Sequence, residues 1–286
     1  MNAHLSAEGA RLVGVASVDR FRGAPVGHRP QDFLPDARSV VVIGLPVLRA
    51  FATGYGSWLD DSTMVPETVT REDPIPNEVL SGPAVGTRTF WPRAAINNHI
   101  WRRCAYEFLN MELQRLSFQT ALFLEEAGFA SIYMPTTYGS TFSWKIGYPI
   151  PNQMAPFSHR HAAVAAGLGT FGLNNLVLTP EYGSLQRFVS VITTAELPPD
   201  PLIEDPLCLG ESCAACRRAC PNGCFAEETM DYDLAGATVR VWRMDKDQCG
   251  RYDDPTRLPC VRECVTRCPV IGSANERLNP PSPGTD

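Results

Sequence analysis

Nine of the ten cysteines in this chain lie in one short stretch near its carboxyl end. They fall between Cys208 and Cys268, within 61 residues, whereas the first 103 residues contain none. The chain does not open with a basic segment followed by an apolar run, so we expect a cytoplasmic protein. Because the cytoplasm keeps thiols reduced, the clustering favours metal binding over disulfides.

The spacing of these cysteines narrows the kind of metal site. The two groups read Cys208-x4-Cys213-x2-Cys216-x3-Cys220-Pro221 and Cys249 followed by Cys260-x3-Cys264-x3-Cys268-Pro269. Two runs that each end in Cys-Pro match the bacterial ferredoxin pattern, in which the fourth cysteine of a run ligates the other cluster. A [4Fe–4S] cluster needs one thiolate for each iron, so two clusters would use eight of the ten cysteines.

We therefore expect two sets of four metal ligands. The first set is Cys208, Cys213, Cys216 and Cys268, and the second set is Cys220, Cys249, Cys260 and Cys264. Cys224 is the alternative to Cys208 or Cys249, and Cys104 lies in a helical stretch where we expect a small buried apolar side chain. Structural zinc is one alternative to the clusters, although four-thiolate zinc sites usually come as paired Cys-x2-Cys, and disulfides are another.

The overall composition predicts a folded, water-soluble protein. Hydrophobic residues make up 44% of the chain and charged residues 20%, which is enough to form an ordinary core. The longest apolar stretch, residues 39–48, is shorter than the roughly 20 residues that a membrane span needs, so we expect no membrane contact. The net charge of -6 argues against a broad nucleic-acid-binding face, and we do not expect a nucleic-acid partner.

The order of apolar runs predicts an α/β (α+β) fold in two parts. Residues 1–197 should form an α/β cofactor domain, residues 198–272 a ferredoxin-like module for two clusters, and residues 273–286 a disordered tail. Helices are expected over 3–15 and 94–127, and the latter should end at Gly128. Strands are expected over 38–46, 130–134, 176–179 and 187–194, a long loop over 50–92 and a stiff proline-rich linker over 198–206.

A glycine-rich segment follows the expected helical region and precedes a strand. Gly167, Gly169 and Gly172 lie within six residues, and glycine lets the backbone approach a bulky ligand closely. A dinucleotide fingerprint needs the order strand, loop, helix, which is not the order here. This segment is therefore not expected to bind NAD.

Several of these motifs together resemble the epoxyqueuosine reductase family, which is related to the reductive dehalogenases. They are residues 34–46 (LPDARSVVVIGLP), residues 166–184 (AGLGTFGLNNLVLTPEYGS), the PPDP linker, the double cysteine set and Asp245-x3-Cys249-x2-Tyr252. The resemblance implies a nitroreductase-like domain that holds cobalamin and a ferredoxin-like module that passes electrons to cobalt. It assigns corrinoid contacts to Gly167, Gly169, Gly172 and Asn174, and more loosely to residues 182–184.

The same resemblance points to further residues around the cofactor. Arg160 stands at a family-typical basic position, where it is either structural or in contact with a cofactor phosphate or amide. His159 and His161 could ligate cobalt or act as acids near neutral pH. The alternative is that His161 is a hydrogen-bonded residue at the start of a helix and that His159 is solvated.

The chain departs from the family pattern at two positions. Gln153 stands where the family has a catalytic aspartate, and Leu173 replaces the lysine of its Gly-Lys-Asn motif. The chain also ends without the family's helical repeat extension, so reduction of epoxyqueuosine in tRNA is not expected. Tyr148 with Lys145 is the expected proton-donating pair, as the resemblance to reductive dehalogenases implies; Tyr138 is a further candidate. Alternatively, Tyr148 simply lines a pocket.

Together these features predict an iron–sulfur oxidoreductase, a corrinoid-dependent reductase of a small molecule. Electrons would come from an external donor such as ferredoxin or flavodoxin and pass through two [4Fe–4S] clusters. One alternative is an electron-transfer protein with a vestigial cofactor domain. Another is a flavin enzyme on the same scaffold, or a protein whose cluster binds substrate directly.

Overall fold

The computed structural model describes residues 2–53, 101–136, 155–250 and 263–276. Its strands are β1 (Leu12–Ser17), β2 (Ser39–Pro46), β3 (Ser131–Tyr133), β4 (Thr170–Phe171), β5 (Val177–Leu178), β6 (Gln186–Thr193), β7 (Phe225–Leu234) and β8 (Ala237–Met244). Its larger helices are α1 (Asn2–Ala7), α5 (Phe108–Glu126) and α7 (His159–Ala165). Shorter helical segments are η1 (Val18–Phe21), α2 (Pro30–Phe33), α3 (Arg49–Thr53), η5 (Trp101–Glu107), α8 (Ala215–Arg218), α9 (Lys246–Gly250), α10 (Glu263–Thr266) and α11 (Ser273–Glu276).

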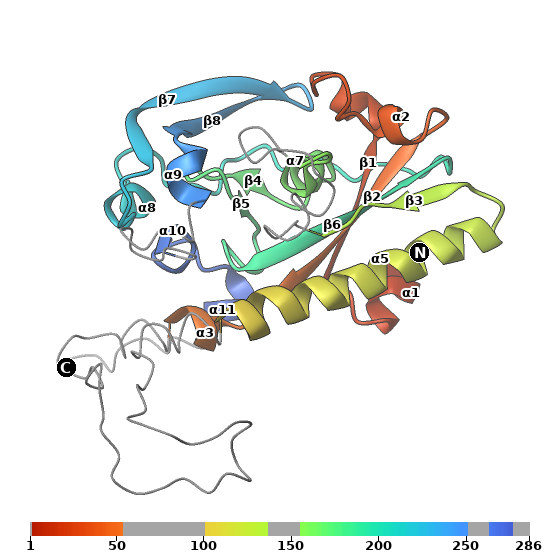
Figure 1. The fold of residues 1–286 in the computed structure, drawn as a ribbon, viewed down its shortest axis with the longest axis horizontal. Coiled ribbons are helices and arrows are strands. Elements are labelled where there is room, and N and C mark those ends of the chain that lie inside the picture. Colours follow the sequence, from red (N-terminus) through yellow and green to blue (C-terminus); the bar gives the residue numbers. More distant parts are fainter. Residues whose placement is uncertain (1, 54–100, 137–154, 251–262, 277–286) are drawn as a thin grey trace, which may run out of the picture.

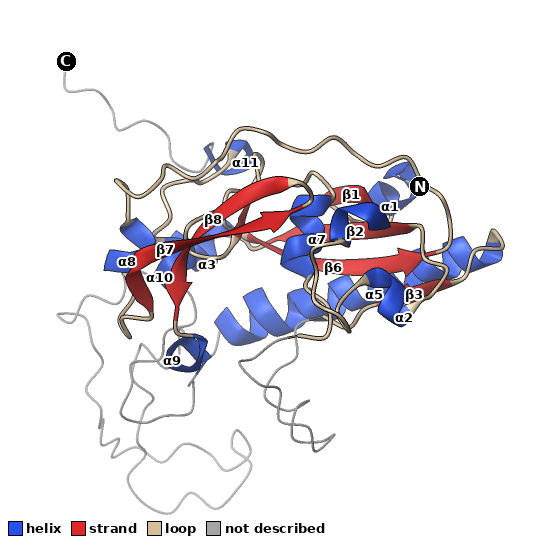
Figure 2. Cartoon of the chain, turned by 90° about the horizontal axis from the view of Figure 1, so that it is seen from above, coloured by secondary structure: helices blue, strands red, loops and turns tan. Residues whose placement is uncertain are grey.

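The core is built on a four-stranded antiparallel sheet with the strand order β1-β2-β6-β3. Strand β2 is buried on both faces, because successive side chains of a strand point to opposite sides. Val41 and Ile43 pack in the cluster that includes Leu113 and Leu116 of α5. Val40 and Val42 pack in the cluster that includes Ala162 and Ala163 of α7. Helices thus cover both faces of the sheet, which confirms the mixed α/β fold (Figures 1 and 2).

The four strands expected from the sequence are present, but the expected first helix is only half right. Helix α1 ends at Ala7, and Gly9 then turns the chain with a φ of 106°. Residues 12–17, of which 12–15 were expected to be helical, form β1 instead. The pattern of apolar residues in this segment fits a strand as well as a helix. Pairing with β2 stabilises the strand.

The long helix is confirmed for its described part, and only some of its apolar residues are buried. It runs from the π-helical η5 into α5 and ends before Gly128, which has a φ of 90°. Leu113, Leu116 and Leu124 are buried on the sheet. Phe108 and Met111 are exposed because only one face of the helix meets the sheet. Cys104 is also exposed, so the expectation that it is buried was wrong.

Two further expectations are corrected at the edges of the described segments. The residues expected as a loop from position 50 begin with α3, and residues 54–92 lie outside the described part. The tail expected to be disordered starts with α11. The backbone N–H groups of Ser273 and Ala274 donate to the carbonyls of Pro180 and Glu181. No described helix is long and apolar enough to cross a membrane.

The expected linker after residue 197 is attached to the edge strand β1. The Asp200 carboxylate accepts a hydrogen bond from the Val15 N–H at 2.8 Å, and the Asp200 N–H donates to the Val15 carbonyl at 2.9 Å. Arg20 donates to the Asp200 carbonyl at 2.8 Å. These bonds set the direction in which the chain enters the cysteine-rich part. That part contains the β7–β8 hairpin and the short helices α8, α9 and α10 (Figure 1).

Candidate functional site

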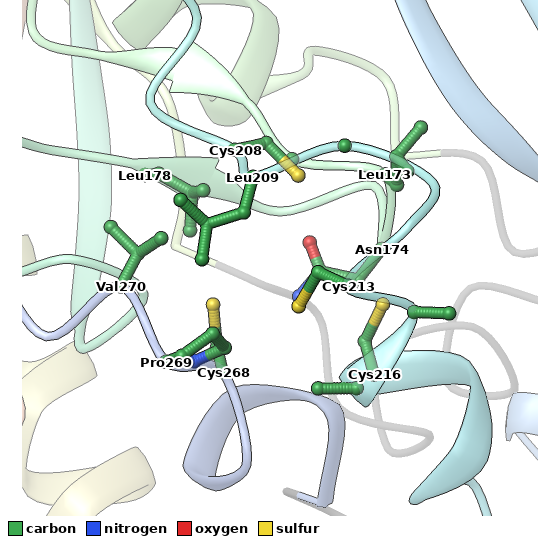
Figure 3. Close-up of a pocket in the computed structure, with 14 residues that line it drawn as sticks. Leu173, Asn174, Leu178, Cys208, Leu209, Cys213, Cys216, Cys268, Pro269 and Val270 are labelled. Atoms are coloured by element: carbon green, nitrogen blue, oxygen red, sulfur yellow. The ribbon is translucent and has the colours of Figure 1, made fainter.

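Four cysteines line a single cavity where the α/β part meets the cysteine-rich part. They are Cys208, Cys213, Cys216 and Cys268, the set that the spacing assigned to the first cluster. The first three come from the segment around α8, and Cys268 comes from the turn after α10. Figure 3 shows their four sulfur atoms around one common space. Segments more than 50 residues apart in sequence thus bring their thiols together.

The rest of the cavity wall is mainly apolar. Leu173, Leu178, Leu209 and Val270 line it with the cysteines. The four cysteines themselves are partly exposed.

Burial makes deprotonation of these thiols unfavourable when no positive charge is nearby. It raises the pKa of Cys216, and the neighbouring Cys208 raises that pKa further. Burial also raises the pKa of Cys268, and Cys208 and Cys216 add to the effect. The Val270 N–H opposes this by hydrogen bonding to Cys268. Four thiolates in so small a space would therefore require positive charge between them, which metal ions supply.

The described cysteines are suited neither to disulfides nor to a single metal ion. All nine of them, which excludes Cys260, are free thiols. Within the described segments, no three His, Cys, Asp or Glu side chains converge closely enough to hold one ion.

The second set of cysteines is only partly described. Cys220 and Cys264 pack against the same apolar cluster as Cys216, Cys249 lies in α9, and Cys260 is outside the described residues. Cys224 is 4% exposed and does not line the cavity of Figure 3, whereas Cys208 does. The Cys224 N–H donates to the Cys220 sulfur at 3.3 Å. This geometry favours Cys208 over Cys224 for the first set.

The glycines of the sequence motif are packed against the chain's own backbone. A Cβ atom on Gly169 would lie 2.1 Å from the Leu178 carbonyl oxygen, and one on Gly167 would lie 2.1 Å from that of Pro201. Gly167 also has a φ of 71°. The close approach expected of these glycines is therefore an approach to protein rather than to a ligand. Contact between this loop and a corrinoid stays a prediction.

The residues after Gly172 join the loop to the cysteine-rich part. The buried Asn174 amide donates to the Cys264 carbonyl at 3.0 Å. The Asn175 amide donates to the Trp242 carbonyl at 3.1 Å, and the Trp242 N–H donates to the Leu173 carbonyl at 2.8 Å. Leu173 is buried with Trp242. Trp242 was not expected at the site, because nothing in its local sequence separates it from an ordinary strand residue.

A second strip of backbone contact lies beside Cys268. A Cβ atom on Gly183 would lie 1.9 Å from the Val270 carbonyl oxygen. The Ser184 hydroxyl donates to the Val265 carbonyl at 2.8 Å. The loosely assigned residues 182–184 thus hold the segment that carries Cys268.

Of the expectations for the two histidines before the glycine loop, the one for His159 is wrong and the one for His161 is confirmed. His159 was expected to be solvated, but its ring is buried, with Nδ1 3.0 Å from the Ser190 hydroxyl and Nε2 2.9 Å from the Pro135 carbonyl. His161 is hydrogen-bonded at a helix start, as expected, with Nδ1 2.6 Å from the N-cap Ser158 hydroxyl. Burial lowers the pKa of each ring to about 4. Neither histidine lines the cysteine cavity.

The other predicted site residues are divided between described and undescribed segments. Arg160 is exposed and donates to the Asn175 carbonyl at 2.5 Å, next to the loop. The predicted proton-donor candidates Tyr138, Lys145 and Tyr148 lie outside the described residues, as does Gln153.

Comparison with known sequences finds reductases in two groups, and no protein-family model matches. The tetrachloroethene reductive dehalogenase of Dehalobacter restrictus is 32% identical over 119 residues, which is 37% of this chain and 21% of the relative. The epoxyqueuosine reductase of Bacillus subtilis is 42% identical over 66 residues, which is 23% of this chain and 16% of the relative. The matched region therefore spans about a fifth of the length of these curated relatives.

Comparison with solved structures finds the same fold. A catabolic reductive dehalogenase in complex with 3-bromo-4-hydroxybenzoic acid matches 96% of this chain and 32% of its own, with a TM-score of 0.57 and 15% identity. A reductive dehalogenase structure described as suggesting a mechanism for B12-dependent dehalogenation matches with a TM-score of 0.56 and 16% identity, over 96% of this chain and 32% of its own. The cysteine pattern, the glycine loop and these similarities agree: the chain is related to the epoxyqueuosine reductases and the reductive dehalogenases.

Proposed function

We propose that this chain is an iron–sulfur oxidoreductase with two [4Fe–4S] clusters. The first would be held by Cys208, Cys213, Cys216 and Cys268, and the second by Cys220, Cys249, Cys260 and Cys264. The observation that carries the proposal is the cavity of Figure 3, where the four thiols of the first set surround one space. The relatives with significant sequence similarity are named as reductases, which supports an oxidoreductase.

The residues around the cavity would perform distinct tasks in such a site. The four cysteines supply the thiolates, while the buried Leu178 forms part of the apolar wall. Hydrogen bonding by the Val270 N–H stabilises negative charge on the Cys268 sulfur. A bound [4Fe–4S] cluster would supply one-electron transfer at a potential of up to several hundred millivolts below zero.

The wider proposal is reduction of a small molecule by a corrinoid next to the clusters. It divides the chain into a nitroreductase-like domain over 1–197 and a ferredoxin-like module over 198–272, with ferredoxin or flavodoxin as the external electron donor. The family resemblance and the dehalogenase fold similarity support it. The described residues do not outline a corrinoid seat, since protein backbone fills the space beside Gly167 and Gly169. No catalytic step is therefore assigned to that cofactor.

A specific observation favours an electron carrier as the second candidate function. Leu173 stands where the family has a loop lysine, and it is buried against Phe225 and Trp242. The loop therefore serves as a contact with the cysteine-rich part. In a carrier, the clusters would pass electrons to a partner protein and the α/β part would hold no cofactor.

Iron content tests the cluster assignment. Protein reconstituted anaerobically with iron and sulfide should hold about eight iron atoms per chain, and Cys208→Ala should hold about four. Cys224→Ala is the matched control and should keep the wild-type content. Cys216→Ala should lose one cluster and Cys260→Ala the other, as followed by electron paramagnetic resonance. Unchanged iron in Cys208→Ala, or stoichiometric zinc in the native protein, would refute the assignment.

Cobalamin binding separates the two candidate functions. A corrinoid enzyme should shift the visible spectrum of added cob(II)alamin and give its base-off electron-spin signal. An iron-loaded protein that leaves both signals unchanged is an electron carrier or uses another cofactor.

A further inference from the structure

The Trp242 side chain has a buried polar atom whose role the fold does not explain. The residue is 3% exposed, and its indole N–H has no hydrogen-bond partner among the described residues. Tryptophan is a donor only, and a buried donor without an acceptor costs free energy. The position of such a group next to a proposed cofactor site suggests that an acceptor is present when the site is filled.

The indole is held firmly against the cysteine cavity. Hydrogen bonds to Leu173 and from Asn175 fix its backbone on both sides. The Arg217 guanidinium lies over the ring, 5.5 Å from its centroid. Cys216 and Cys220 pack against the apolar cluster to which the ring belongs. The ring therefore has little freedom to turn its N–H elsewhere.

The group with which this N–H interacts is the thiol of Cys216. The thiol packs against the cluster that contains the ring, and the guanidinium of the adjacent Arg217 lies over that ring. The two groups are thus close, although they do not meet the geometry of a full hydrogen bond in the free thiol. A neutral thiol is a weak acceptor, whereas a thiolate attracts an N–H strongly.

We propose that the indole N–H of Trp242 donates a hydrogen bond to the Cys216 sulfur of the first cluster and raises the reduction potential of that cluster. The inference rests on the proposed function, since it requires a cluster held by Cys216. The reduced cluster carries one more negative charge than the oxidised cluster. A donor to its sulfur therefore stabilises the reduced form more, and hydrogen bonds to sulfur are among the features that set these potentials.

The test is a redox titration of reconstituted protein in a Cys249→Ala background, which isolates the first cluster. Trp242→Phe removes the N–H and keeps an aromatic ring. At a fixed potential, the ratio of reduced to oxidised cluster should fall about threefold to tenfold; for a one-electron couple, tenfold corresponds to 59 mV. Phe225→Leu is the control, because Phe225 shares the same apolar cluster and has no donor. It should leave the ratio within twofold of wild type.

Two further measurements guard against a variant that fails to fold. Replacing Trp242 with 3-benzothienylalanine keeps the ring shape but puts sulfur in place of N–H, and should give the same fall as Trp242→Phe. In unsubstituted protein with ¹⁵N-labelled indole, pulsed electron paramagnetic resonance should detect coupling between the reduced cluster and one Nε1.

The possible failures are distinguishable. A chain that takes up no iron would refute the proposed function itself. An iron-loaded chain with no nitrogen coupling, or whose potential is unchanged by both substitutions at 242, would overturn the tryptophan inference alone. An equal shift in Phe225→Leu would also overturn it, since the effect would then come from packing.

Discussion

At the scale of single residues, His159 shows how burial fixes a protonation state. Its ring satisfies both nitrogens as a neutral group: Nε2–H donates to the Pro135 carbonyl, and Nδ1 accepts from the Ser190 hydroxyl. Burial, together with the nearby Arg187 charge, lowers its pKa to about 4. A proton on this ring would add a buried charge and displace the serine hydrogen. The residue thus acts as a neutral tie between α7, β6 and the segment after β3.

This residue predicts a pH dependence of stability. The unfolded chain takes up a proton on His159 near its ordinary pKa of 6.5, whereas the folded chain does so only near 4. The stabilisation is therefore complete above about pH 6.5 and is lost as the pH falls toward 4. When the pH falls from 6.5 to 5, the free energy of unfolding measured with urea should fall by about 1.5 kcal/mol more for wild type than for His159→Gln. His161 is present in both proteins, so its contribution to the pH dependence of stability cancels in the comparison.

The exposed His4 provides the matched control for this measurement. His4→Gln should keep the wild-type pH dependence. Identical pH slopes for wild type and His159→Gln would show that the His159 ring is not held neutral in the folded state.

At the scale of elements, the β4–β5 hairpin depends on a glycine that a sequence motif assigned to ligand binding. Strand β5 crosses so close to Gly169 that no side chain fits between them. The turn of this hairpin contains Asn174, whose amide donates to the Cys264 carbonyl. The position of the loop against the cysteine-rich part is therefore set by backbone packing within a few residues.

Substitution at Gly169 should consequently destabilise the fold. In Gly169→Ala, the Cβ would lie 2.1 Å from the Leu178 carbonyl oxygen, so the hairpin must shift. We expect a loss of about 1–3 kcal/mol in the free energy of unfolding, measured by urea denaturation of the metal-free protein. Gly23→Ala is the control: its nearest neighbour would be 3.6 Å away, and its stability should change by less than about 0.5 kcal/mol. Equal effects of the two substitutions would contradict this account.

The elements that sequence could predict are those whose signal is local. The β-branched run of β2 indicates a buried strand whichever partner it finds, and the cysteine spacing indicates four thiols around one cavity. The role of Gly169 and the position of Trp242 could not be predicted in this way. Gly169 is constrained by Leu178 across a turn, and Trp242 reaches its place through bonds to Leu173 and Asn175, about 70 residues earlier in the chain. Such contacts depend on tertiary packing, which periodicity does not encode.

At the scale of the whole molecule, the segment that connects the α/β part to the cysteine-rich part is itself hydrogen-bonded to the sheet. The sequence suggested a stiff proline-rich linker, but its stiffness comes equally from Asp200, which bonds β1 through both its carboxylate and its backbone. Pro201 then packs on Gly167. The cysteine-rich part is therefore held at its entry by β1 and along its length by the glycine loop.

Removing the Asp200 carboxylate should loosen this entry. In Asp200→Ala, the Val15 N–H loses its acceptor while the backbone bond between the two residues remains. Amide hydrogen exchange at Val15 should speed up by about tenfold or more, because the lost bond was made to a charged group. Asp205 is exposed and serves as the control: Val15 should exchange at the wild-type rate in Asp205→Ala. Unchanged protection at Val15 in Asp200→Ala would assign the attachment to the remaining bonds.

The separation of Cys268 from its three partners has a consequence for biosynthesis. Cys208, Cys213 and Cys216 are synthesised within a few codons of one another. The fourth cysteine of their set, Cys268, is made only later. In the proposed iron site, the ligand set is therefore complete only after residue 268 has been made. Ribosome-bound intermediates that stop before that codon should lack the first cluster.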